Sequence, residues 1–167
     1  LTTNIIGANS TAVGYYALRF ATGSDNTAVG ATCLDSLTTG AQNTAVGTNA
    51  LTAITTVSNC CAMGYNALAA NTATTMTAFG ALALALNTSG IQNTAVGYNT
   101  LATNLTGGSN TAVGYNALAL ATCSSNTAVG STCLDSLTTG SNNTAMGNGA
   151  LTAITIATAC CAFGAGA

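Results

Sequence analysis

Residues 110–114 read Asn-Thr-Ala-Val-Gly, and this pentapeptide returns along the whole chain with few changes. The glycine that closes each copy recurs at intervals of 16 or 17 residues, in the order 16, 17, 17. Self-similarity at a short fixed period is the signature of a solenoid, in which each repeat buries its apolar face by stacking on its neighbours. The ten closing glycines are Gly14, Gly30, Gly47, Gly64, Gly80, Gly97, Gly114, Gly130, Gly147 and Gly164.

The composition between the glycines favours strands over helices. Thr and Val are abundant, glycine interrupts every repeat, and the run Leu82-Ala-Leu84-Ala-Leu86 alternates with the period of two typical of an extended segment. We therefore predict an all-β fold, a parallel β-solenoid (β-roll) of about ten coils of 16–17 residues. At the usual strand spacing, ten coils would stack to a length of about 48 Å.

One repeat array is expected to span residues 1–167 as a single domain. Three repeats make a 50-residue unit, and a 100-residue super-repeat relates residues 26–67 to residues 126–167. Solenoids need terminal caps, because a bare edge strand is a template for further pairing. Residues 1–7 look like a shortened repeat and the chain stops just after Gly164. We expect either that the natural chain continues or that copies stack end to end.

Aligning the copies on their glycines defines columns of equivalent residues. The residue before the glycine, the Val column, is apolar in every copy and is expected to face the core: Val13, Val29, Val46, Met63, Phe79, Val96, Val113, Val129, Met146 and Phe163. Strand alternation puts the Thr column on the same face: Thr11, Thr27, Thr44, Cys61, Thr77, Thr94, Thr111, Thr127, Thr144 and Cys161. The Ala column between them, from Ala12 to Ala162, is expected to point outward against a close neighbour such as another chain.

Further columns complete each repeat. The glycines are expected at bends that need a positive φ or close backbone approach. A second core ladder, the Leu column, follows four residues later: Leu18, Leu34, Leu51, Leu68, Leu84, Leu101, Leu118, Leu134 and Leu151. Apolar anchors are expected seven residues after the glycine in 17-residue repeats (Leu37, Ile54, Leu137, Ile154) and six after it in 16-residue repeats (Phe20, Leu120). Leu86 breaks that rule, so the extra residue has no single expected location.

Charge is nearly absent, at 2% of residues against roughly 25% in ordinary soluble proteins. Arg19, Asp25, Asp35 and Asp135 are the only charged side chains, so the chain has no electrostatic footprint for nucleic acid. A charge-poor surface also lacks the repulsion that keeps copies apart, which favours self-association end to end or side by side. No stretch is long and apolar enough for a transmembrane segment.

Catalytic, cofactor-binding and metal-binding residues are not predicted. With zero His and three acids, the chain offers no acid–base pair or nucleophilic triad, so we do not expect an enzyme or a cofactor. The seven cysteines show no Cys-x-x-Cys spacing. We interpret Cys61 and Cys161 as small buried replacements for Thr. The alternative is that Cys60, Cys160 or Cys123 forms intermolecular disulfides that staple a fibre in an oxidising setting.

Two of the columns suggest binding, and a third is assigned to the turns. The Thr column resembles the flat Thr arrays of ice-binding solenoids, but a buried Val column on the same face argues against that use, and two cysteines interrupt the array. The Asn column, which precedes the Thr column, faces the other way and is expected to form turn-side hydrogen-bond ladders: Asn26, Asn43, Asn93, Asn110, Asn126 and Asn143. Tyrosines after the glycine form a candidate row for carbohydrate contact or chain packing: Tyr15, Tyr65, Tyr98 and Tyr115.

Residues 110–118, Asn-Thr-Ala-Val-Gly-Tyr-Asn-Ala-Leu, with Thr-Thr-Gly-Ser-Asn-Asn at 138–143, resemble the head repeats of trimeric autotransporter adhesins. Related repeats occur in phage tail-fibre proteins. The resemblance implies a left-handed parallel β-roll, usually of three chains side by side, displayed outside the cell for adhesion. The repeats here are longer than in that family, carry cysteines and have almost no charge.

Together these observations predict a structural protein, a subunit or segment of an extracellular or cell-surface fibre or filament that self-assembles through stacked β-coils. The alternative function is an adhesin-head or tail-fibre module for cell or surface adhesion, with a surface or glycan ligand. Ice binding is the third possibility. Expected partners are further copies of the chain, as a stack or a trimer, and no nucleic acid.

Overall fold

The computed structural model describes residues 7–167, and the shortened repeat expected at the N-terminus lies almost wholly outside them. The described chain contains ten strands of three residues each, one per repeat. They are β1 (Thr11–Val13), β2 (Thr27–Val29), β3 (Thr44–Val46), β4 (Cys61–Met63), β5 (Thr77–Phe79), β6 (Thr94–Val96), β7 (Thr111–Val113), β8 (Thr127–Val129), β9 (Thr144–Met146) and β10 (Cys161–Phe163).

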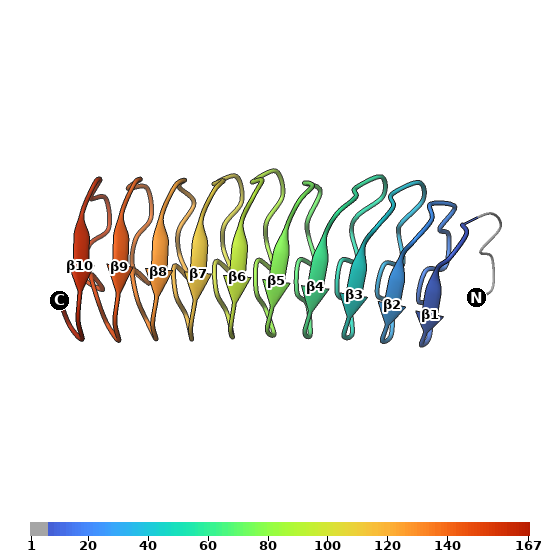
Figure 1. Cartoon of the computed structure of the whole chain (residues 1–167), viewed down its shortest axis with the longest axis horizontal. Helices are drawn as coiled ribbons and strands as arrows, with labels where there is room; N and C mark the ends of the chain where they lie inside the picture. Colours follow the sequence, from blue (N-terminus) through green and yellow to red (C-terminus); the bar gives the residue numbers. More distant parts are fainter. Residues whose placement is uncertain (1–6) are drawn as a thin grey trace.

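The strands form one parallel sheet in chain order, β1 to β10 (Figure 1). Each residue pairs with the residue in the same column of the next coil, so that Thr94 lies beside Thr111 and Val96 beside Val113. The coils stack into a long, narrow rod, with β1 at one end and β10 at the other. The prediction of an all-β parallel solenoid is confirmed.

The assignment of the two strand faces is wrong. The Ala column points into the coil, and Ala28, Ala45 and Ala95 are fully buried. The Val and Thr columns share a face, as alternation requires, but that face is the outer one. The coil is too thin for large side chains to point inward from both of its sides. The alanine of the motif therefore points inward, and the β-branched Thr and Val side chains point outward.

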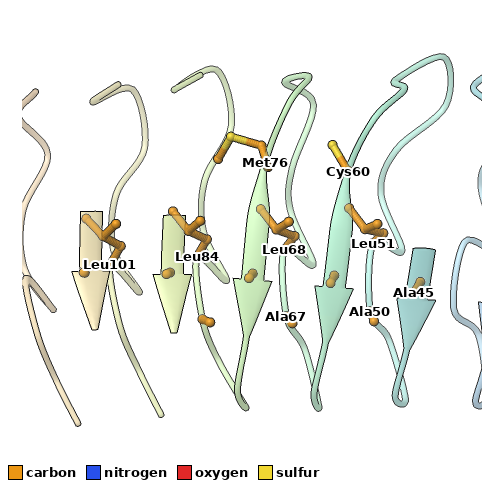
Figure 2. Packing of buried hydrophobic residues seen from close by; sticks show 14 of the residues in the cluster. Ala45, Ala50, Leu51, Cys60, Ala67, Leu68, Met76, Leu84 and Leu101 are labelled. Atoms are coloured by element: carbon orange, nitrogen blue, oxygen red, sulfur yellow. The ribbon is translucent and has the colours of Figure 1, made fainter. Parts of the chain in front are cut away.

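The core is a set of parallel ladders along the rod. The Leu column is confirmed as a core ladder, with eight of its nine members fully buried and Leu151 partly buried. Figure 2 shows Leu51, Leu68, Leu84 and Leu101 repeating the same orientation from coil to coil, with the small side chains of Ala45, Ala50 and Ala67 around them. Every inward side chain therefore packs against its own counterparts in the neighbouring coils.

The second half of each coil is built from turns, so the expected strand at residues 82–86 is wrong. Leu82 and Leu84 have φ values of 62° and 51°, in the left-handed region. The backbone alternates between turn bonds within the coil, such as Ala83 N–H to Gly80 O, and bonds to the next coil, such as Leu84 N–H to Thr100 O at 3.0 Å. A coil of 16–17 residues has to reverse its direction several times, and these turns override the alternating sequence.

The apolar anchor lies seven residues after the glycine in both repeat lengths. Ala21 and Ala121 occupy this inward position in 16-residue repeats, as Leu37 does in a 17-residue repeat, whereas Phe20 and Leu120 are about half exposed. The inward anchors of the remaining coils are Ile54, Asn71, Asn87, Asn104, Leu137 and the partly buried Ile154. The interpretation of Phe20 and Leu120 as anchors is wrong.

The extra residue of the longer coils has one location, contrary to expectation. The amides of Thr38 and Thr39 both donate to the carbonyl of Thr55, and those of Thr22 and Gly23 both donate to the carbonyl of Thr38. This pairing sets Thr22 beside Thr38, while Gly23 lies against Gly40. Residue 39 is therefore the insertion, and its counterparts are exposed: Thr56, Ser89, Thr106, Thr139 and Ile156. An exposed loop tip accommodates one residue more without shifting the inward ladders.

Candidate assembly interface

The outer face of the sheet is made by the Thr and Val columns of β1 to β10, and we call it the Thr/Val face. Seven members of the Val column are at least 37% exposed: Val13, Val29, Met63, Phe79, Val96, Met146 and Phe163. Val46, Val113 and Val129 are half-buried. A row of exposed and half-buried apolar side chains along one face is typical of a surface that contacts another molecule.

The hydroxyls of the Thr column are free of partners within residues 7–167. No side-chain hydrogen bond involves Thr27, Thr44 or any other threonine of this column. The threonines eight residues after the glycine behave differently, since the Thr38 hydroxyl donates to the Thr55 carbonyl at 2.9 Å in the next coil. The Thr/Val face thus presents unpaired donors and acceptors between apolar side chains.

The exposure of this face removes the first argument against ice binding. The Thr column was expected to be buried beside the Val column, and the structure places both columns outward. The second argument stands, because Cys61 and Cys161 interrupt the threonines. The large side chains of Met63, Phe79, Met146 and Phe163 add a third, because they are bulkier than the valines of the same column and make the face uneven.

The structure overturns the interpretation of Cys61 and Cys161 as core residues. Cys61 and Cys161 belong to the outer face, the first half-buried and the second exposed, so they are not core replacements for Thr. Cys60 and Cys123, two of the candidates for intermolecular disulfides, are buried, while Cys160 is half-buried. All seven cysteines are unbonded. Burial raises the pKa of Cys33 to about 11, and it also raises the pKa of Cys60, Cys61, Cys123 and Cys133.

The Asn column forms the expected hydrogen-bond ladder, but it does so inside the coil. The Asn43 amide group donates to Oδ1 of Asn26 at 3.2 Å and to the carbonyl of Val57 at 2.8 Å, and Oδ1 of Asn43 accepts from the Cys60 amide at 3.0 Å. All six members of the column are fully buried or nearly so. Buried amides are tolerated because nearly every donor and acceptor is paired.

Sequence reasoning missed a second ladder of buried amides, formed by Asn71, Asn87 and Asn104. The amide of Asn87 donates to Oδ1 of Asn71 at 2.8 Å, and that of Asn104 donates to Oδ1 of Asn87 at 3.1 Å. The signal was their position seven residues after the glycine, where other coils carry Leu37 or Ile54. Asn87 and Asn104 also belong to Asn-x-Ser/Thr triplets, and their burial leaves no access for glycosylation.

Tyrosines lie beyond the bend, beside the Thr/Val face. The rings of Tyr98 and Tyr115 stack with their centroids 5.4 Å apart, and both side chains are about half exposed. Tyr15 and Tyr65 are exposed as well. The aromatic row predicted from the sequence is therefore present at the surface, with one stacked pair in the middle of the rod.

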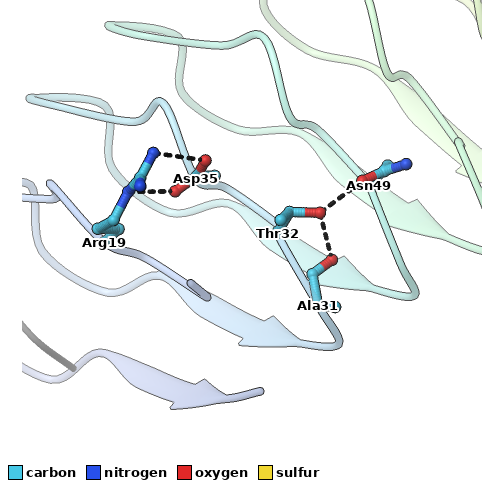
Figure 3. A network of polar contacts seen from close by, with 5 residues as sticks. All are labelled: Arg19, Ala31, Thr32, Asp35 and Asn49. Carbon is cyan, nitrogen blue, oxygen red and sulfur yellow. Dashed lines mark hydrogen bonds and ion pairs between the residues drawn. The ribbon is translucent and has the colours of Figure 1, made fainter. Parts of the chain in front are cut away.

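The N-terminal coils carry the one cluster of opposite charges in the described chain. Arg19 Nε lies 2.8 Å from Asp35 Oδ1, and Arg19 Nη2 lies 3.0 Å from Asp35 Oδ2, joining the first coil to the second (Figure 3). The guanidinium also lies 4.2 Å from the Tyr16 ring centroid. Close by, the Thr32 hydroxyl contacts Asn49 Oδ1 and the Ala31 carbonyl. The Arg19–Asp35 and Thr32–Asn49 contacts bridge successive coils, and the charged residues lie outside the strands.

Residues 7–167 contain no pocket, and no cluster of three or more His, Cys, Asp or Glu residues that could hold a metal ion. The same residues include no helix that could cross a membrane. The class that this architecture defines is the tandem-repeat parallel β-solenoid. Comparisons with known proteins go no further, since no protein-family model, no curated protein and no solved structure matches the chain.

Proposed function

We propose that the chain is a structural segment of an extracellular fibre that grows by the stacking of β-coils. The observation that carries the proposal is the uniform register of all nine strand pairs, in which every column continues unchanged from coil to coil. Each coil offers to the following coil the same backbone and side-chain groups that the preceding coil offers to it. A stack with this property can be extended by any further coil of the same sequence pattern.

Backbone hydrogen bonds join the coils along the length of the rod. From β1 to β9 the Thr-column amide donates to the next coil, as Thr27 N–H does to Asn43 O at 2.8 Å. From Gly30 to Gly164 the glycine amide donates to the previous coil, as Gly30 N–H does to Val13 O at 2.8 Å. Within the structure, β10 pairs with β9 alone. The amide of Cys161, which stands in the Thr column of β10, is the group that would bind a following coil.

The surface also favours association. Four charged side chains among 167 residues provide little repulsion between copies. The setting outside the cell rests on the resemblance to adhesin head repeats and tail-fibre proteins, whose function is exercised there. The chain thus combines a stacking geometry with a surface that does not oppose assembly.

Electron microscopy of the purified protein in reducing buffer tests this function. We expect filaments much longer than the roughly 48 Å of ten stacked coils. The Cys161→Pro variant removes the amide hydrogen that would bind the next coil and should shorten the filaments. Cys161→Thr is the matched control, because it also removes the thiol but keeps the amide, and it should form filaments. Single rods of the wild type at all concentrations would contradict the proposal.

The exposed tyrosine row supports a second candidate, a surface-binding or adhesin module. Stacked aromatic rings such as Tyr98 and Tyr115 present flat apolar faces that suit sugar rings. A glycan-binding assay with the wild type and the Tyr98→Ala/Tyr115→Ala variant addresses this function. Binding that the double substitution abolishes would favour it, and absence of binding to all glycans would favour the purely structural role.

A further inference from the structure

We propose that the Thr/Val face binds the same face of a second copy, with the two rods running in opposite directions and β5 of one copy facing β6 of the other. The proposed fibre supplies the setting for this pairing, which would join rods side by side. The pairing itself concerns a different surface from the one through which coils stack. Two chains would thus form a laterally closed pair.

The chemistry of the face suits burial against itself. Its ten strands carry only Thr, Val, Met, Phe and Cys in the outward columns, and no charged residue lies among them. The described charges of Arg19, Asp25, Asp35 and Asp135 lie off the strands. Facing apolar side chains would lose contact with water, and the free Thr hydroxyls would find partners on the facing threonines.

The relief of the face selects the relative direction of the two rods. Large side chains occupy the Val column in two adjacent pairs, Met63 with Phe79 and Met146 with Phe163, and valine occupies the other six coils. When two rods run in the same direction, the two-fold axis lies along the rods and reverses the strands, so the Val column of one copy faces the Thr column of the other and loses its apolar partner. When they run in opposite directions, every large side chain faces a valine of the partner: Phe79 faces Val96, Met63 faces Val113, Met146 faces Val29 and Phe163 faces Val13.

This arrangement is produced by a two-fold axis parallel to the strands, passing between β5 and β6. Rotation about that axis keeps positions along the strand, so the Val column faces the Val column and the Thr column faces the Thr column. It reverses the order of coils, so β1 faces β10 and β3 faces β8. Such an interface is isologous, the arrangement found in most dimers, and it closes without leaving a free copy of the same surface.

The area of the face favours overlap along its full length. Ten coils at about 4.8 Å and three residues at about 3.3 Å give a flat face of about 480 Å² on each copy, or about 960 Å² for the pair. Specific interfaces bury about 1,000 Å² or more, and the relief of the side chains adds to the flat area. An offset of several coils would fall well below this limit, so the full overlap of β1 to β10 is the register expected.

Ice is the competing occupant of a threonine-rich face, and the relief argues against it. A lattice of water molecules is flat on this scale, whereas Met63 and Phe79 form a ridge across the middle of the face. The same ridge is an asset in the pairing of two copies, because the partner presents only valines opposite to it. The observations therefore favour a second copy of this chain.

Charge substitutions test the register. Met63→Asp and Val113→Lys each place a single charge in the face, and each should weaken the dimer at least tenfold in sedimentation equilibrium. The double variant should recover most of that loss, because the new carboxylate at position 63 of one copy would face the new ammonium group at position 113 of the other. Within one chain the two positions are three coils, about 14 Å, apart and would not pair directly. The control is Met63→Asp/Val13→Lys, which places the lysine opposite β10, at least three coils or about 14 Å from the new carboxylate of either copy, and should not recover.

All variants are compared in the Cys161→Pro background with reductant, so that end-to-end growth and disulfides do not contribute, and circular dichroism verifies folding. If the protein with the wild-type Thr/Val face stays monomeric up to high concentration, the pairing is overturned. Thermal hysteresis in that sample would identify ice as the occupant of the face. Equal recovery in the two double variants would overturn the proposed register. In the protein without the Cys161→Pro substitution, dimers that form no filaments would contradict the proposed fibre but not the pairing. Filaments one rod wide would contradict the pairing but not the fibre.

Discussion

The backbone of Gly97 lies so close to that of Gly114 in the next coil that a Cβ on Gly97 would come within 1.9 Å of the Gly114 carbonyl oxygen. Gly97 also has a φ of 126°, in the region that side chains rarely adopt. Both features recur from Gly14 to Gly147, and Gly164 shares the positive φ, which is why no other residue closes the pentapeptide. The bend predicted from the sequence thus combines a positive φ with close backbone approach.

Gly97→Ala should therefore destabilise the rod by more than about 2 kcal/mol, measured by urea denaturation. Gly149 is the matched control. It has a φ of 66°, and a Cβ there would meet only Thr152 Cγ2 at 3.7 Å. Asn occupies the equivalent position in other coils, for example Asn99 and Asn116, so Gly149→Asn should leave stability unchanged or raise it by up to about 1 kcal/mol. Equal losses in the two variants would contradict this account of the column.

The Leu column combines complete burial with a left-handed backbone, and this predicts an unusual sensitivity to side-chain shape. Leu68 is fully buried with a φ of 52°. Leu68→Met keeps the volume and the unbranched Cβ, and should cost less than about 1.5 kcal/mol. Leu68→Ile also keeps the volume, but it adds a branch at Cβ in a conformation where branching is strongly disfavoured. We expect Ile to cost at least about 1 kcal/mol more than Met in thermal or urea unfolding; the reverse order would show that the backbone conformation does not matter there.

The strand faces show what sequence reasoning reached and where it failed. Alternation correctly placed Thr44 with Val46, and Asn43 with Ala45, on opposite sides of the strand. The choice of the inward side relied on hydrophobicity, which ranks Val above Ala, and this choice inverted both faces at once. The better signal was size, since alanine occupies its column in all ten copies while the Val column admits Met and Phe. A position that tolerates Phe79 beside Val96 has room to vary, as an exposed position does.

Turns were the other source of error. The alternation at Leu82 and Leu84 was typical of a strand, but each coil must close within 16 or 17 residues and uses left-handed residues to do so. The Leu column was correctly predicted because one strongly apolar residue recurs at a fixed distance from the glycine. The assembly surface could not be identified from the sequence, because its recognition depends on which face of a three-residue strand is the outer one.

The buried amide ladder predicts a large cost for removing one of its members. Asn43→Ala would leave the Val57 carbonyl and the Cys60 amide without their partners and would break the contact with Asn26. Each buried group left unpaired costs about 1–3 kcal/mol, so the total loss should reach at least about 3 kcal/mol in urea denaturation. Met76 stands in the same column without an amide, and Met76→Leu, which removes no polar group, is the control that should cost less than about 1.5 kcal/mol.

Alkaline pH should destabilise the rod through its buried thiols. Burial raises the pKa of Cys33 in the folded chain from an ordinary value of 9.0 to about 11. The unfolded chain therefore loses this proton first, and the stability that is fully present below about pH 9 is lost as the pH rises toward 11. Cys33→Ala should reduce the loss between pH 8 and pH 10.5, and it is a mild change because Ala17 and Ala50 hold the same position in adjacent coils. An identical pH dependence of unfolding in the wild type and the variant would contradict this assignment.

Thiol accessibility gives a direct check on the corrected face assignment. Cys161 is exposed on the outer face and should react first with a thiol reagent, followed by the half-buried Cys61 and Cys160. Cys61 should react more slowly than Cys161, because burial raises its pKa. The four buried cysteines should react only when the chain unfolds: Cys33, Cys60, Cys123 and Cys133. Mass spectrometry of the labelled peptides, with and without urea, assigns each site. Rapid labelling of Cys60 in the folded protein, with Cys61 protected, would support the inward Thr column expected from the sequence and would contradict the structure. Labelling of Cys61 before Cys60 would support the outward Thr column, on which the proposed pairing depends.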